Sequence, residues 1–491
     1  MKKALALFLS ILFLCLAFAG CGKKDQGTTD ESTTPTTQPP ADTEMDYELE
    51  VKDLEAREMT ILMPEGRIKQ FAEYTANPEA LNEGIVKRNQ QVEQTMNCTL
   101  YYNNVPLNAE LMSGIMTSEM LNQTGDFDVV FYEYWWNQEI HGYFYNLLES
   151  DVIAIDQPFY NNGWNNAATV KGTLNSLAGY GSIELMQRTS VTAFNKNMYN
   201  SLFTDSLYSY VDSGDWTLET MEEMAKAAHI DSGNDGVIEA AGERYGMVYD
   251  LWGGRAMLFT MGGQCTVKDD EGVPSVSFAT ESNLNILEQM QRLYNENYVN
   301  FNRDDAATAF SQNQALFSMT VFGTVETIRK TASGVNYGLV PFPKFNTAQQ
   351  NYISTNTGTS TWSIPITAES KDDSAYLLNA FHYYSYQYVK PAYFDTVLKS
   401  QIAGDPDSAR MIDLIMDTIY VDFAFVQDAN LSNGVVNDIG QAVSVCNGSF
   451  EIIRGKISKD FTSFSSGVKD VYEANLAEFI ERYVNGSGSA A

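Results

Sequence analysis

Residues 125–136, with the sequence GDFDVVFYEYWW, decide the fold class of this chain. The segment begins with a turn, continues as an unbroken apolar run and ends in a cluster of aromatic residues. A short apolar run bounded by turn residues is typical of a strand that is buried on both faces. Four earlier segments complete a strand–helix–strand–helix–strand order: residues 59–66, 82–96, 98–105 and 107–121. This alternation predicts an α/β fold with a largely parallel sheet.

The carboxyl ends of these strands are the expected ligand-binding edge, because ligands of open α/β sheets bind beyond the ends of the strands. The rule points to residues 64–67, which include Glu65 and Arg67, and to residues 132–136. The chain also contains 28 Tyr, whose rings combine an apolar face with a hydroxyl and so suit a sugar ring. For most of the aromatic residues the alternative is packing in the core or on the surface. For Glu65 and Arg67 the alternative is a pair of solvated charges.

The first twenty residues have the features of a secretory signal. Lys2 and Lys3 precede an apolar run over residues 4–19, which is too short and too close to the N-terminus for a membrane span. The sequence FAGC, which ends at Cys21, resembles the bacterial lipobox, in which the cysteine carries a diacylglycerol. We expect a lipoprotein signal peptide over residues 1–20 and a lipid anchor at Cys21 that holds the protein on the extracellular face of the cell membrane. The alternative is an ordinary signal peptide with a chance cysteine.

The rest of the chain divides into a tether and a large folded part. Residues 21–56 are rich in Thr, Pro and acidic residues, so they are expected to form a disordered tether. Of the 491 residues, 435 follow residue 56, which is too many for one ordinary core and predicts two lobes. The 63 acidic and 31 basic residues give a net charge of −32, which argues against a nucleic-acid partner because such proteins present a basic face.

Motifs for catalysis and for cofactors are missing from the sequence. It contains no GxSxG, HExxH, GxxxxGK[ST] or GxGxxG pattern, and its three His are far apart. We therefore expect no enzyme activity, no cofactor and no His-rich metal site. Cys98, Cys265 and Cys446 show no CxxC spacing, which predicts buried thiols, with a single disulfide as the alternative.

The order of seven segments resembles the extracellular solute-binding proteins of ABC importers, in the group that includes the maltose-type sugar binders. The resemblance covers nearly all of the chain after the tether. The segments are GDFDVVFYEYWWNQEIHGYFYNLLES, DWTLETMEEMAKAA, DGVIEAAGERYGM, AMLFTMGG, AFSQNQALFSMTVFG, VNYGLVPFPK and STWSIPITAESKDDSAYLLNAF. Each segment alone is a weak signal, whereas their order and spacing together are fairly specific to the family, though not to any ligand.

The resemblance implies a two-lobe periplasmic-binding-protein-like fold of type II, with a ligand cleft between the lobes and a hinge. It places the first lobe at residues 57–186, with 362–430 returning to it, and the second lobe at residues 187–361, with 431–491 returning to it. The implied function is to capture a carbohydrate, expected to be an oligosaccharide, and to deliver it to the permease subunits of an ABC transporter. The resemblance implies a monomer that performs no chemistry itself.

The resemblance also implies a set of ligand-binding residues. The first lobe would contribute aromatic contacts after its third strand, and the second lobe would contribute contacts between a Tyr-Gly strand and a Gly-Gly helix. Phe322 stands where the family often has Trp, and Trp362 lies at a predicted crossing between lobes, as a hinge residue or a ligand contact. The remaining residues of this set are Tyr132, Tyr134, Trp135, Asp250, Trp252 and Arg255.

A segment with the sequence DSGNDGVIEAAGE resembles a calcium loop at Asp231, Asp235 and Glu239. Gly233 and Gly242 stand where such a loop needs oxygen ligands, so a turn that ends a helix is the default interpretation and no metal is expected.

Three other functions compete with the receptor interpretation. A binding protein for a peptide or another polar solute would keep the fold and change the ligand. A surface-anchored glycoside hydrolase would need a carboxylate pair, for which Asp126 and Asp128 are candidates. These two residues lie at the start of a strand, whereas ligands are expected at its other end. A purely structural lipoprotein would not explain why the aromatic residues at 132–136 lie at the expected ligand-binding edge.

Overall fold

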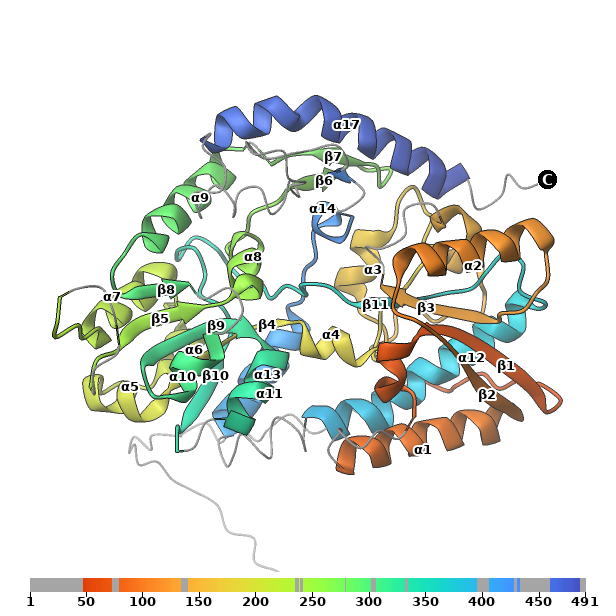
Figure 1. The fold of residues 1–491 in the computed structure, drawn as a ribbon, viewed down its shortest axis with the longest axis horizontal. Helices are drawn as coiled ribbons and strands as arrows, with labels where there is room; N and C mark the ends of the chain where they lie inside the picture. Colours follow the sequence, from red (N-terminus) through yellow and green to blue (C-terminus); the bar gives the residue numbers. More distant parts are fainter. Residues whose placement is uncertain are drawn as a thin grey trace, which may run out of the picture. The chain divides into compact units, whose positions relative to one another are not determined.

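The first sheet has four strands in the order β11-β3-β1-β2 (Figure 1). Strand β1 (Arg57–Pro64) pairs in parallel with β2 (Cys98–Val105) and with β3 (Val129–Glu133), and β11 (Ser360–Ser363) joins the edge of β3 in the antiparallel direction. Helices α1 (Glu79–Met96) and α2 (Ala109–Asn122) alternate with these strands, which confirms the predicted α/β order.

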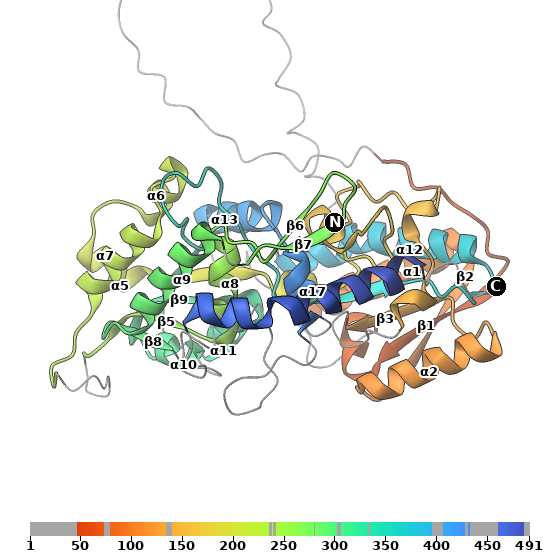
Figure 2. The ribbon, with the colours of Figure 1, turned by 90° about the horizontal axis from the view of Figure 1, so that it is seen from above.

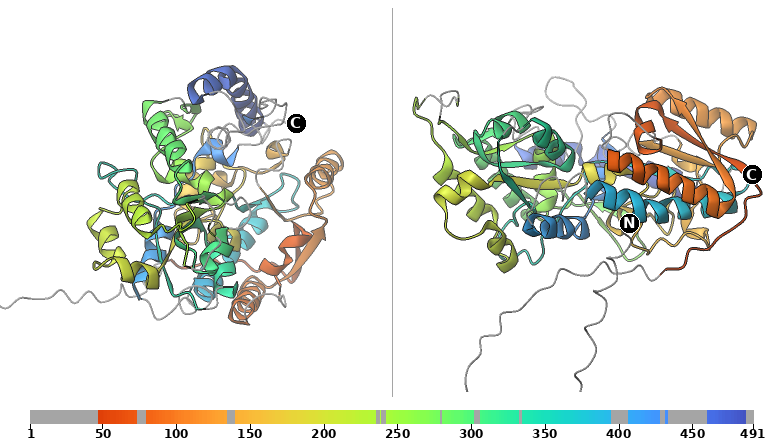
Figure 3. Two further views of the ribbon diagram at one scale, coloured as in Figure 1. Left: turned by 60° about the vertical axis from the view of Figure 1, so that its left-hand side comes forward. Right: turned by 90° about the horizontal axis from the view of Figure 1, so that it is seen from below.

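This structure is a computed structural model of the chain. It describes residues 47–72, 79–133, 140–234, 238, 242–278, 280–301, 306–331, 334–394, 406–427, 431–432 and 460–485. Helix α12 (Lys371–Tyr384), which continues as a π-helical turn over Ser385–Val389, packs beside α1 on one side of the first sheet (Figures 1 and 3). Helix α2 covers the other side of the sheet (Figure 1). Both faces of β3 are therefore covered, and all five of its residues are buried.

The second sheet has five strands in the order β10-β4-β9-β5-β8. Its strands are β4 (Ser190–Asn195), β5 (Tyr245–Tyr249), β8 (Val299–Phe301), β9 (Ala315–Val321) and β10 (Tyr337–Val340). Strand β5 runs parallel to β8 and β9, whereas β4 is antiparallel to β9 and β10. The two sheets confirm a mixed α/β architecture with two lobes.

The second lobe also contains a set of helices. They are α5 (Lys196–Leu202), α6 (Leu207–Ser213), α7 (Leu218–Ala228), α8 (Leu251–Thr260), α9 (Glu281–Tyr294), α10 (Ala306–Ser311), α11 (Phe322–Thr331) and α13 (Pro406–Asp417). In α7 the hydroxyl of Thr217 accepts a hydrogen bond from Thr220 N and so caps the helix. The apolar face of α7 is buried, with Met221 fully inaccessible to solvent.

Helices α7 and α9 are joined by an ion-pair cluster around Glu222. The two carboxylate oxygens of Glu222 accept from the two terminal nitrogens of Arg292 at 2.5 and 2.7 Å, and Tyr298 Oη donates to Glu222 at 2.6 Å. These contacts, led by the hydrogen bond from Arg292, lower the pKa of Glu222 from 4.5 to about 2. The side chain of Glu222 is only 8% exposed, so the carboxylate depends on these partners rather than on water.

We expect the Glu222 cluster to give the protein a sharp loss of stability in acid. Because the pKa of Glu222 is lower in the folded than in the unfolded state, its contribution is complete above pH 4.5 and is lost as the pH falls toward 2. Replacing Glu222 by glutamine should lower the free energy of unfolding by on the order of 2 kcal/mol at pH 7, and the difference from the wild type should shrink at pH 3. Urea denaturation of the wild type and the variant at both pH values measures this difference in the free energy of unfolding. The exposed Glu219→Gln on the same helix is the matched control, and equal behaviour of the two variants would contradict this prediction.

The chain passes between the sheets at a pair of hydrogen-bonded segments. Helix α4 (Ile183–Gln187) leads from the first lobe into β4, and residues 354–360 lead back to β11. The two crossings are joined by a bridge between Thr189 and Asn356, and by a hydrogen bond of 2.9 Å from Ser190 N to Thr355 O. We refer to residues 183–190 and 354–360 together as the α4 junction.

Two C-terminal elements differ from the predicted return of the chain to each lobe. Helix α13 belongs to the stretch expected to return to the first lobe, yet it packs on β10 of the second sheet, where Leu339 N donates to Ser408 Oγ at 2.9 Å. Helix α17 (Phe461–Asn485) contacts both β7 (Pro274–Val276) and the turn at His141–Tyr143, so it touches both lobes (Figures 1 and 2). The other lobe boundaries stay a prediction.

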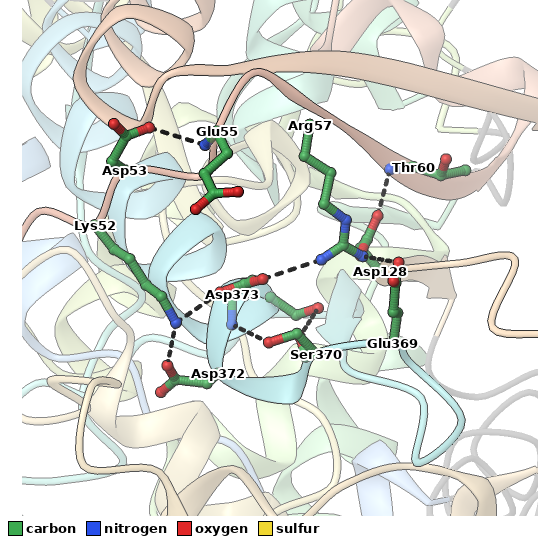
Figure 4. Close-up of polar contacts among 11 residues, drawn as sticks. Lys52, Asp53, Glu55, Arg57, Thr60, Asp128, Glu369, Ser370, Asp372 and Asp373 are labelled. Atoms are coloured by element: carbon green, nitrogen blue, oxygen red, sulfur yellow. Dashed lines mark hydrogen bonds and ion pairs between the residues drawn. The ribbon is translucent and has the colours of Figure 1, made fainter.

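The last residues of the predicted tether are packed against the first lobe. The ring of Tyr47 lies 5.4 Å from that of Phe159, Leu54 is buried, and Lys52 forms ion pairs with Asp372 and Asp373 at 2.5 and 2.7 Å (Figure 4). The prediction of disorder up to residue 56 is therefore wrong for residues 47–56. The polar composition of this segment predicts disorder, but the side chains of Tyr47, Lys52 and Leu54 are enough to hold residues 47–56 on the lobe. Within the described residues, no helix has the length and the apolar character needed to cross a bilayer.

Candidate functional site

The carboxyl edge of the first sheet carries a buried ion-pair cluster. Arg67 lies in the 3₁₀ turn that follows β1, and Glu133 is the last residue of β3. Arg67 forms an ion pair with Glu133, and its Nε lies 3.1 Å from Glu184 Oε1. The side chain of Arg67 is 15% exposed and those of both glutamates are 4% exposed. Burial lowers the pKa of Arg67, and the carboxylate of Glu184 opposes that shift.

Glu184 ties this cluster to the α4 junction. Its Oε2 accepts hydrogen bonds from the backbone N of Ser360, at 3.0 Å, and from the hydroxyl of the same residue. Arg188, one turn further along α4, lies 3.3 Å from Glu184 Oε1. A buried carboxylate needs such partners because it has lost its hydration. Glu184 therefore connects the end of β1, the helix of the crossing and the start of β11.

The second lobe presents the ends of β5 and β9 at the same junction. The two strands are parallel, so their carboxyl ends meet, and the helices α8 and α11 start there. Asp250 caps α8: its carboxylate accepts from Gly253 N at 2.8 Å, from Thr320 Oγ1 at 2.6 Å and from Thr324 Oγ1 at 3.2 Å. Burial raises the pKa of Asp250, and these three donors oppose the shift. Asp250 thus fixes the start of α8 against the start of α11.

Trp252 and Arg255 stand on the first turn of α8, beyond Asp250. Both are partly exposed, and the guanidinium of Arg255 lies 5.5 Å from the centre of the Trp252 ring. A cation at this distance from an indole is attracted to the ring, which limits the motion of both side chains. The pair offers an aromatic surface beside a set of hydrogen-bond donors, which is the combination that the sequence predicts at this edge.

Contacts across the junction reach α11. Phe322 N donates to Thr189 O at 3.1 Å, and Gln187 Nε2 donates to Glu326 Oε1 at 3.3 Å. The hydroxyl of Tyr393, which follows the π-helical turn of the first lobe, also donates to Glu326. Glu326 is therefore a second-lobe carboxylate that binds both α4 and the first lobe. Nothing in the local sequence around Glu184, Glu326 or Tyr393 indicates this role.

Three of the predicted ligand contacts are core residues in this structure. Tyr132 is 0% exposed and stacks on Phe144 at 5.4 Å, and Trp362 is 1% exposed and packs against Phe131 at 4.8 Å. Phe322 is 0% exposed. None of these three side chains is accessible to a ligand here, in contrast to the expectation from the resemblance. Glu65 is exposed at the end of β1, and Tyr134 and Trp135 lie outside the described residues.

The segment that resembles a calcium loop is organised by a glutamate. Glu243 is buried, and its carboxylate accepts from Ser232 N at 3.1 Å and from Gly233 N at 3.3 Å, which stabilises a turn after α7. Asp235 and Glu239 lie outside the described residues. Across the described ranges of the chain, no group of three or more His, Cys, Asp or Glu is placed to hold a metal ion.

The carboxylates that were considered for hydrolysis lie in a structural ion-pair cluster. Asp128 is 4% exposed, forms an ion pair with Arg57 and accepts a hydrogen bond of 2.8 Å from Thr60 N (Figure 4). Arg57 also contacts Asp373 at 3.1 Å (Figure 4). Asp126 accepts from Thr124 Oγ1 at 2.8 Å. Both carboxylates lie at the start of β3, away from the α4 junction, and Asp128 serves to hold β1 against α12.

Removing the Arg57 side chain should therefore destabilise the first lobe. An Arg57→Met variant leaves Asp128 buried beside Asp373 without its cation. We expect a loss of about 2 kcal/mol in the free energy of unfolding, below the usual cost of breaking a buried pair because the Arg57 side chain is 24% exposed. Urea denaturation followed by circular dichroism measures this loss. The control is Arg482→Met, whose pair with Glu478 is exposed; a cost for Arg57→Met no larger than that of the control would contradict a structural role.

Cys98 and Cys265 are buried, and burial raises the pKa of the Cys98 thiol to about 12. Cys446 lies outside the described residues.

No known family model matches the sequence, and no curated protein sequence matches it. Among solved structures, the sugar-binding protein MalE from Xanthomonas citri aligns with a TM-score of 0.58 at 13% identity, over 87% of this chain and 99% of that one. An ABC substrate-binding protein from Listeria monocytogenes in complex with cycloalternan aligns with a TM-score of 0.52 at 11% identity, over 86% of this chain and 99% of that one.

A cyclo/maltodextrin-binding protein complexed with maltotetraose aligns with a TM-score of 0.51 at 10% identity, over 88% of this chain and 98% of that one. These alignments cover almost the whole length of the other proteins. At such low identity they establish a shared fold, which confirms the two-lobe α/β architecture predicted from the sequence.

Proposed function

We propose that this chain, which has the two-lobe fold of the substrate-binding proteins of ABC transporters, is itself such a receptor and binds a carbohydrate. The observation that carries the proposal is the α4 junction, where the carboxyl ends of strands from both sheets meet. Ligands of α/β sheets bind at such ends. The solved structures with this fold include complexes with cycloalternan and maltotetraose, which supports a sugar as the ligand class.

Two partly exposed side chains, those of Trp252 and Arg255, suit a sugar. The face of Trp252 can stack on the C–H face of a pyranose ring, and Arg255 can donate to hydroxyls beside it. Asp250, Glu133 and Glu184 are already engaged with protein partners, so we assign them to the support of the site rather than to direct contact. Arg67 belongs with this supporting set.

Binding is proposed to couple to closure of the lobes. The junction consists of short hydrogen-bonded crossings, and a hinge of this kind can absorb a rigid-body rotation. A ligand that contacts both lobes binds the closed state more tightly than the open state. The difference between these two binding free energies is the amount by which the ligand stabilises the closed state. We further propose that Cys21 carries the lipid anchor, that the chain before Tyr47 is the tether and that the closed form is delivered to a permease.

The first test is a thermal-shift screen of the chain from residue 45 against neutral oligosaccharides, monosaccharides and peptides. A ligand present at about 100 times its Kd stabilises the folded state by roughly 2.7 kcal/mol and so raises Tm. The proposal predicts hits among sugars that are recovered unchanged after long incubation. A sugar that is consumed would favour the hydrolase. Hits confined to peptides would keep the fold and overturn the carbohydrate ligand.

A further inference from the structure

A cavity of about 490 Å³ lies in the second lobe between the end of α6, the loop that follows β10 and the end of α13. Its volume is in the range of pockets that hold small molecules. None of the ligand-binding residues predicted from the sequence lines it. The most informative lining residues are Asp212, Asp215, Lys344, Gln350, Asn351 and Tyr352.

Lys344 is the unusual group in this cavity. The residue is only 5% exposed, and its backbone is fixed by hydrogen bonds with Trp216 O, at 3.1 Å, and Leu218 N, at 2.8 Å. Within the described part of the chain, its ammonium group has no hydrogen bond or ion pair; its one contact of note is the ring of Tyr352, 5.4 Å away. Gly214 lines the cavity, and a Cβ added to it would lie 3.0 Å from Lys344 Nζ. The ammonium group therefore lies beside Gly214 at the wall of the cavity.

The side chain of Lys344 is nearly buried and its ammonium has no counter-ion among the described residues, so the site favours an anionic occupant. Asp212 is not the counter-ion of Lys344, because its carboxylate forms a bidentate ion pair with Arg410 at 2.5 and 3.0 Å. Asp215 accepts from Ser213 Oγ at 2.8 Å and keeps further capacity to accept hydrogen bonds. Its negative charge would repel a second anionic group, which restricts the occupant to a single carboxylate.

The rest of the lining is rich in neutral hydrogen-bonding groups. Gln350 and Asn351 carry amides, and Thr347 and Thr418 carry hydroxyls, all of which can both donate and accept. Tyr352 Oη donates to Val211 O at 3.2 Å, so its ring is held as one wall. Such a lining complements several hydroxyl groups. We propose that this cavity is a second binding site for a sugar acid, with its carboxylate on Lys344 and its hydroxyls on Asp215, Gln350 and Asn351.

The site adjoins the α4 junction from the side of α13. Ser354 N donates to Thr418 O at 3.0 Å, and Tyr420 N donates to Ser354 O at 2.8 Å. Thr418 lines the cavity, and Ser354 begins the crossing back to the first lobe. An occupant of the cavity therefore contacts residues that position the hinge. This proposal does not rest on the sugar proposed for the junction, because the cavity and its lysine stand on their own contacts.

Isothermal titration of the chain from residue 45 with sodium D-glucuronate, up to about 10 mM, tests the site. We expect glucuronate to bind and D-glucose to bind at least tenfold more weakly at this cavity. Lys344→Met, which keeps the length of the side chain and removes the charge, should weaken glucuronate binding at least tenfold. The control Lys469→Met, on the exposed face of α17, should leave it unchanged.

Two further variants test whether glucuronate binds in this cavity and not at the junction. Asn351→Asp places a second negative charge at an exposed part of the lining, where it does not threaten folding, and should weaken glucuronate binding about fivefold. Trp252→Ala should leave glucuronate binding unchanged, which separates this site from the junction. The proposal is overturned if glucuronate does not bind, if binding survives Lys344→Met, or if Trp252→Ala abolishes it. None of these results depends on whether a neutral sugar binds at the junction.

Discussion

Replacing Trp252 by alanine is expected to weaken the binding of the sugar found in the thermal screen by about 30-fold, which corresponds to roughly 2 kcal/mol. Trp252 is the partly exposed aromatic residue at the start of α8, and Arg255 lies against its ring at 5.5 Å. Its removal takes away both the stacking surface and the support that orders the guanidinium. Titration calorimetry with the purified variant measures the loss.

The matched variants separate stacking from general damage. Trp252→Phe keeps an aromatic face and should retain affinity within about fivefold. Tyr101→Ala removes an aromatic residue that is 48% exposed on β2, far along the chain from α8, and should have no effect on binding. If Trp252→Ala binds the sugar as tightly as the wild type does, the contact surface lies elsewhere and the assignment of Trp252 is wrong.

The sequence predicted the parts of the fold that depend on local pattern. The alternation of strands and helices before residue 133 follows from hydrophobic periodicity and from the turn residues between the segments. The place of the ligand edge rests on the general behaviour of parallel strands and stays a prediction. These features need no knowledge of distant contacts.

Two residues that support the site, Glu184 and Glu326, could not be predicted in this way. Glu184 binds Ser360, 176 residues later in the sequence, and Glu326 binds Gln187 across 139 residues. Each contact depends on how the crossings bring the lobes together, which no local pattern records.

The burial of Tyr132 and Trp362 has a related cause. Alternation along a strand separates two faces, but it does not show which face is open to a ligand. Helices cover both faces of the first sheet, so every residue of β3 is buried and β11 is buried as well. The aromatic residues of such strands pack in the core even though they lie close to the ligand edge.

Replacing Arg67 by methionine is expected to lower the free energy of unfolding by about 4 kcal/mol, in the range seen when one partner of a buried ion pair is removed. Arg67 balances both Glu133 and Glu184, and the two carboxylates are 4% exposed. Without the guanidinium they remain buried with like charge, and the Ser360 donors satisfy only one of them. Urea denaturation at pH 7 measures the change.

The control is Arg410→Met, which breaks a pair with Asp212 in which both side chains are about half exposed and should cost less than about 1 kcal/mol. The comparison also decides between the two roles considered for Arg67. A residue that contacts ligand directly would lose affinity on substitution while the unfolding transition stays near that of the wild type. A large loss of stability, with a smaller loss of affinity when the variant is still folded, places Arg67 among the residues that hold β1, β3 and α4 in register at the junction. Equal and small costs for Arg67→Met and Arg410→Met would refute that structural role.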